Sequence, residues 1–118
     1  MAFHDPVAIV VAALTAAGVT AATRPPDTRP AELATVKRVG GLRMNQALEH
    51  ARIAVEFWAQ TGPAAAALAA TGRAAVWALA VTDDRVMRVR EALVFDVPDP
   101  ATGLPRVRVD FDLHLTAN

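Results

Sequence analysis

Two carboxylates, Asp110 and Asp112, stand two residues apart in the C-terminal segment RVRVDFDLHLT. Alternate residues of a strand point to the same face, so these side chains would lie about 7 Å apart. Carboxylates at that distance could bind a cation or act as general acid and base. Arg106, Arg108 and His114 share the same face. We therefore favour an ion-pair network across a hairpin over a catalytic or metal-binding pair.

The other residues that could carry chemistry are isolated from one another. His4, His50 and His114 lie far apart, and none has a second His or a Glu at the helical spacing of a zinc site. We expect each histidine to be solvated. The chain contains no Cys and no Ser, which excludes disulfides, thiolate metal sites and both nucleophiles. The glycines form no phosphate-binding pattern. We predict no catalytic residue, no metal site and no cofactor.

Composition limits the class of protein. At 118 residues the chain fits a single domain, 1–118, and 53% of its residues are apolar, which argues against disorder. Lys+Arg and Asp+Glu both number 12. A neutral chain is a poor candidate for general nucleic-acid binding, which depends on neutralising phosphates. Low net charge with many apolar residues favours association, so we expect an oligomer.

Two apolar segments could be mistaken for export or membrane signals. Residues 7–22 resemble a signal-peptide core, but Asp5 precedes them and no Lys or Arg does. Residues 63–81 approach membrane-spanning length, but Gly72 and Arg73 lie near their centre. A central Arg costs about 2.5–3.5 kcal/mol on insertion scales. We expect two soluble helices and no membrane contact.

The N-terminal half predicts a helix followed by strands. Asp5-Pro6 marks the helix start and Gly18 its end. Segment 19–23 could be an edge strand, and 24–30 is a loop that prolines stiffen. A strand over 33–39 should end at Gly40-Gly41. Residues 42–50 have no clear period and predict a flexible excursion or a short helical turn.

The central unit is a strand that turns sharply into a helix. Residues 51–60 alternate as a half-buried strand does, and Thr61, Gly62 and Pro63 then open a helix that runs to about Val81. One face of that helix should pack on the sheet, with Gly72 allowing close approach; it carries Leu68, Gly72, Ala75, Val76 and Leu79. Trp77 lies on the opposite face.

Two strands joined by a turn complete the chain. Segment 85–97 places Met87, Val89, Leu93, Phe95 and Val97 on one face, with Arg88 and Arg90 opposite. Residues 98–105 are a turn rich in proline, and 106–116 alternate cleanly. We therefore predict an α+β fold: a two-layer sandwich with a mostly antiparallel sheet of 4–5 strands and two helices packed on one face.

The order of these motifs resembles the tail terminator proteins of long-tailed, siphovirus-type phages, and the likeness extends over nearly the whole chain. An apolar helix leads to the Arg29-Pro30 step. A strand then reaches Gly40-Gly41 in VKRVGG, and the central strand ends at Trp58-Ala59 before an Ala-rich helix. PDPATGLPR at 98–106 precedes the alternating strand. The chain departs from the family pattern in its middle-loop length and in having few acidic residues in the second helix.

The resemblance implies a non-enzymatic virion protein at the head-proximal end of the tail, assembled in the host cytoplasm. A ring of six subunits would stack on the last ring of tail-tube protein, stop tube polymerisation and offer a surface to head-completion proteins. DNA would pass through the lumen. The alternatives are another neck or head-closure connector subunit, or a small ligand-binding or enzymatic α+β domain with a pocket between helix and sheet.

For subunit or partner contacts, we expect loop 40–50 to be mobile until a partner orders it. Trp77 either lies in a subunit interface or is covered by the first helix or the chain end within the monomer. The candidate interface residues are Lys37, Arg38, Arg43, Trp77, Arg88, Arg90, Arg106 and Arg108.

Overall fold

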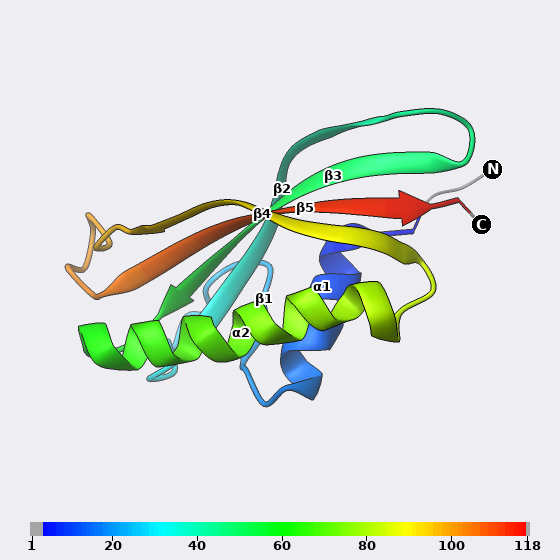
Figure 1. Cartoon of the computed structure of the whole chain (residues 1–118). Helices are drawn as coiled ribbons and strands as arrows, with labels where there is room; N and C mark the ends of the chain where they lie inside the picture. The colour runs from blue at the N-terminus through cyan, green and yellow to red at the C-terminus, as the bar shows by residue number, and fades with distance from the viewer. Residues whose placement is uncertain (1–3, 118) are drawn as a thin grey trace.

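A computed structural model describes residues 4–117 as two helices and a five-stranded sheet (Figure 1). The strand order is β1-β2-β3-β5-β4; β1 pairs in parallel with β2, and the other pairs are antiparallel. Both helices pack on one face, which confirms the expected two-layer α+β sandwich. The elements are α1 (Pro6–Ala16), β1 (Ala21–Ala22), β2 (Leu33–Arg43), β3 (Leu48–Trp58), α2 (Gly62–Thr82), β4 (Val86–Asp96) and β5 (Arg106–Thr116).

The helix starts follow from their capping residues. The Asp5 carboxylate accepts hydrogen bonds from the backbone N–H groups of Val7 and Ala8, which lack partners within the helix. The Thr61 hydroxyl accepts one from Ala64 N–H at the start of α2. Gly18 adopts φ +86° just beyond α1, a conformation that favours glycine. These ends confirm the helix boundaries predicted from the sequence.

The core lies between the sheet and the two helices. Gly72 permits their close approach, because a Cβ there would overlap the ring of Phe57 on β3. By length and composition α2 could cross a membrane, but here its apolar side packs on the sheet. The side chains that build the core include Val107, Val109, Phe111, Leu113 and Leu115 of β5, Leu68, Val76 and Leu79 of α2, and Ile9, Val10 and Leu14 of α1.

The prediction that Gly40-Gly41 ends a strand is wrong. β2 continues to Arg43 and pairs with β3 down to Glu49, with a bulge between Arg38 and Gly40. Gly41 takes φ +109°, and a Cβ there would overlap the backbone of His50. Glycine therefore lets the strand pass through the bulge. Residues 42–50 are strand ends around a short turn, so the expected helical turn is not present. The mobility expected for 40–50 stays a prediction.

The predicted faces of the strand over 85–97 are right for Val89, with Arg88 and Arg90 opposite, and wrong for Met87, Leu93 and Phe95. Pairing with β5 shifts between Val86 and Arg88 and again between Glu91 and Leu93, and each bulge reverses the alternation of side chains. Val86 and Val89 are buried, whereas Met87 and Leu93 are 57% and 53% exposed. The first bulge leaves Met87 outside the core, and after the second Leu93 lies on the helix-free face.

Candidate functional site

One face of the sheet carries no helix, and we call it the open face (Figure 1). Cross-strand register shows which residues share it: Lys37, Ala54 and Asp110 form one row, for example. The charged side chains that the strands place on it are six cations, Lys37, Arg52, Arg88, Arg90, Arg106 and Arg108, and three carboxylates, Glu56, Asp110 and Asp112.

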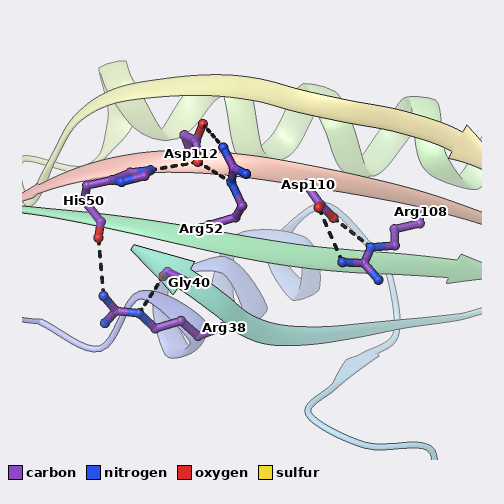
Figure 2. Close-up of polar contacts among 7 residues, drawn as sticks. All are labelled: Arg38, Gly40, His50, Arg52, Arg108, Asp110 and Asp112. Carbon is purple, nitrogen blue, oxygen red and sulfur yellow. Dashed lines mark hydrogen bonds and ion pairs between the residues drawn. The ribbon is translucent and has the colours of Figure 1, made fainter. Parts of the chain in front are cut away.

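Asp112 is the centre of the strongest polar cluster on the open face (Figure 2). Arg52 Nε and Nη2 donate to Asp112 Oδ1 and Oδ2 at 2.9 and 3.1 Å, and His50 Nε2 lies 2.8 Å from Oδ1. The hydrogen bonds from Arg52 lower the pKa of Asp112 to about 2, although burial opposes the shift. Asp112 is therefore a permanent anion at neutral pH, unsuited to general acid catalysis there.

The other two carboxylates are also held by guanidinium groups. Arg108 Nε donates to Asp110 Oδ1 at 2.8 Å (Figure 2), and Arg106 Nη1 donates to Glu56 Oε2 at 2.6 Å. The expected ion-pair network exists, but its cross-strand links join β5 to β3 and β3 to β2, and none joins β5 to β4 across the hairpin among the described residues. Among residues 4–117 no group of three His, Asp or Glu side chains could hold a metal ion.

The prediction that His50 and His114 are isolated and solvated is wrong. β3 and β5 pair them in register, and their rings stack with centroids 5.2 Å apart at 20°. Both side chains are only partly exposed. Burial lowers the pKa of His114, as do the nearby His50, Arg88 and Arg90. Strand pairing, which sequence spacing does not reveal, brings these rings together.

The predicted interface residues separate into three groups. Lys37, Arg88, Arg90, Arg106 and Arg108 share the open face. Arg38 and Arg43 lie on the β2–β3 hairpin, where their register partners Ile53 and Glu49 belong to the helix-covered face. Trp77 lies on α2.

The hairpin arginines have partners of their own. Arg38 pairs with Glu49 at 2.6 Å and donates to the carbonyls of Gly40 and His50 (Figure 2 shows the latter two contacts), and Arg43 donates to Asn45 O. Sequence reasoning missed Arg52, His50 and Glu56 as members of the charged network. Only their register partners on β5 could have identified them.

Trp77 is not covered by α1. It is 47% exposed, and its Nε1 donates to Glu91 Oε2 on β4 at 2.7 Å. Arg73 holds the same carboxylate through two hydrogen bonds of 2.9 and 2.7 Å. Arg73 is the main cause of the lowered pKa of Glu91. These bonds fix the indole at the side of the sheet where β4 is the outermost strand.

Large exposed apolar side chains lie on two opposite sides of the described chain. Strands β2 and β4 lie near opposite edges of the sheet, since β1 covers only two residues of β2. We call the two groups the β2 side (Val39, Leu42 and Met44) and the β4 side (Trp77, Val81, Met87, Leu93 and Val94).

The site thus consists of a charged open face between two apolar sides. Such an arrangement can form contacts with other macromolecules, because cations such as Arg88 and Arg90 and the apolar side chains of both sides are exposed. A comparison of the sequence with known protein families and with curated proteins found no match.

Proposed function

We propose that this protein is a structural subunit of a phage tail. It forms a ring, of six subunits by the resemblance, on the last ring of tail-tube protein, ends tube polymerisation and joins the tail to head-completion proteins. DNA passes through the ring. The proposal combines the motif order in the sequence with one structural observation, the division of exposed apolar side chains between the β2 side and the β4 side.

That division suits a head-to-tail contact. A ring that closes by rotation joins two different patches, one from each neighbouring subunit. The β2 side and the β4 side are two such patches, and they lie at opposite edges of one rigid sheet. The half-exposed indole of Trp77 strengthens the argument, because aromatic side chains are enriched at the cores of protein interfaces.

The state of the carboxylates supports a structural role over an enzymatic one. Asp112, Asp110 and Glu56 each accept a hydrogen bond from a guanidinium group. The pKa of Asp112 is lowered to about 2, so that carboxylate is unsuited to general acid catalysis near neutral pH. A hollow of about 480 Å³ between α1 and α2 is lined mainly by alanines, such as Ala12, Ala13 and Ala78. That lining provides few polar groups to orient a small substrate.

Light scattering on the purified chain, alone and mixed with the tube protein from the same genome, tests the proposal. We expect a ring mass at high protein concentration, or on addition of the tube protein. Binding only to a head-completion protein would instead assign the chain to a neck connector. A protein that stays monomeric at millimolar concentration and binds no tube would contradict the proposed function.

A further inference from the structure

The chain is neutral overall, but its charges are distributed unevenly over its surface. The open face carries six Lys and Arg side chains and three carboxylates. Glu32, Asp84 and Asp96, by contrast, are exposed outside that network. One face is therefore basic although the net charge of the chain is zero. A net charge of zero does not exclude the binding of a polyanion to that face.

Internal ion pairs account for only part of this positive charge. Arg52, Arg108 and Arg106 each bind one of the three carboxylates, and Lys37 lies 3.9 Å from Glu56. Arg88 and Arg90 are exposed on β4, and neither forms an ion pair within residues 4–117. Two residues apart on one strand face, they project in parallel about 7 Å apart.

The stacked histidines lie beside these two arginines. Arg88 pairs in register with His114, and Arg90 with Asp112. His114 Nδ1 is buried and has no hydrogen-bond partner among the described residues. We call the group of Arg88, Arg90, His50 and His114 the basic corner of the open face.

We propose that the basic corner binds the phosphate backbone of DNA. Guanidinium groups suit phosphate because they present several N–H donors in a fixed fork. Protein–DNA interfaces are more polar and much more positively charged than protein–protein interfaces, whose cores are depleted of charge. The basic corner matches the description of a protein–DNA interface, because its members are polar or positively charged. The large exposed apolar side chains of the open face, Leu42 on β2 and Leu93 on β4, are not part of it.

This inference goes beyond the proposed function, because it requires neither a ring nor a tail tube. It also makes binding dependent on pH. The charged and titratable groups nearest His114 in the sheet are His50 and Arg52 of β3, Asp112 of β5, and Arg88 and Arg90 of β4. Burial is the main cause of the lowered pKa of His114, and the nearby cations add to it. A bound phosphate would offset those cations, so DNA binding should tighten as pH falls from 8 to 6.

Fluorescence anisotropy with a labelled duplex of about 20 base pairs, in a series of salt concentrations, tests the proposal. We expect binding that is independent of sequence and weakens with salt. Replacing both arginines, as Arg88→Ala with Arg90→Ala, should raise Kd roughly tenfold at low salt and reduce the slope of log K against log salt by about two. The charge-preserving pair Arg88→Lys with Arg90→Lys should retain most of that slope.

The control is Arg24→Ala with Arg85→Ala, which removes two cations from exposed positions outside the basic corner; Arg85 forms an ion pair with Asp83. It should bind DNA nearly as the unmodified chain does. No DNA binding at low salt, or an equal loss in the control, would overturn the proposal. Tighter binding to polyglutamate than to DNA at equal charge would also overturn it and indicate an acidic protein partner. Thermal melting of each variant verifies that it is folded.

Discussion

The two faces of β5 differ although they belong to one strand. Val109, Phe111 and Leu113 point to the helices and are fully buried among apolar side chains. Asp110 and Asp112 point to the open face, where they are only 4% and 5% exposed. Arg108 of β5 donates to Asp110, and Arg52 of β3 donates to Asp112. Packing on the helix-covered face depends on the shape and apolar area of the side chains. Burial of the carboxylates on the open face depends on their pairing with arginines.

The two faces contribute differently to stability and to binding. Burial of apolar side chains is the main favourable term in folding, whereas a partly exposed ion pair contributes little. We infer that the helix-covered face maintains the fold and that the open face is available for contacts with other molecules. Changes to the two faces should therefore have separable effects.

The largest effect should come from the helix-covered face. Phe111→Ala removes a fully buried ring and leaves a cavity, so the free energy of unfolding should fall by about 3–5 kcal/mol. Urea denaturation followed by circular dichroism measures it. A loss below about 1 kcal/mol would mean that this face does not dominate stability.

Assembly should depend on the β4 side and not on the core. Trp77→Ala should weaken ring formation by roughly 2 kcal/mol or more, with the melting of the monomer nearly unchanged, because the indole is 47% exposed. Thr71→Ala, at another exposed position of α2, is the control. A fall of about 3–5 kcal/mol in monomer stability with assembly intact would show instead that Trp77 is a core residue.

The contribution of the open face to stability should depend on pH, because it comes mainly from the ionised carboxylate of Asp112. The folded pKa of Asp112 is about 2, below its usual value of 3.8. Its stabilisation is therefore complete above pH 3.8 and is lost as pH falls towards 2, which amounts to about 2 kcal/mol. Urea midpoints between pH 5 and pH 2 measure this loss. Asp112→Asn cannot titrate, so an equally steep acid dependence in that variant would exclude Asp112 as the cause.

The smallest effect should come from His114. Its folded pKa is lowered, mainly by burial, so the unfolded chain binds a proton more readily than the folded chain. Stability should therefore decrease as pH falls from about 7 through the usual histidine pKa near 6.5. His114→Gln should lose this contribution. Identical pH dependence in the two proteins between pH 8 and pH 5.5 would contradict the shift.

The sequence predicted the features that depend on neighbouring residues. Asp5 and Thr61 mark helix starts, Gly72 marks a close approach, and the alternation of 106–116 gives β5 and its two faces. Local chemistry determines each of these, so a single sequence suffices.

Features set by pairing between distant strands were not predicted. The bulges at Val39, Met87 and Ala92 change which side chains share a face, and their positions are set by pairing with β3 and β5. The contacts of Asp112 with Arg52 and His50 depend on the register of β3 with β5. The basic open face could not be predicted from the net charge of zero, because that number sums the charges of the open face and of the rest of the surface.

Electron microscopy of tail tubes polymerised with and without this protein tests the proposed function most directly. The tube protein from the same genome would be assembled in both cases. We expect the protein to end tube growth, giving shorter tubes with a ring at one end, and Trp77→Ala to weaken both effects. Tubes of unchanged length with no added density at either end would contradict the proposed role in ending tube growth.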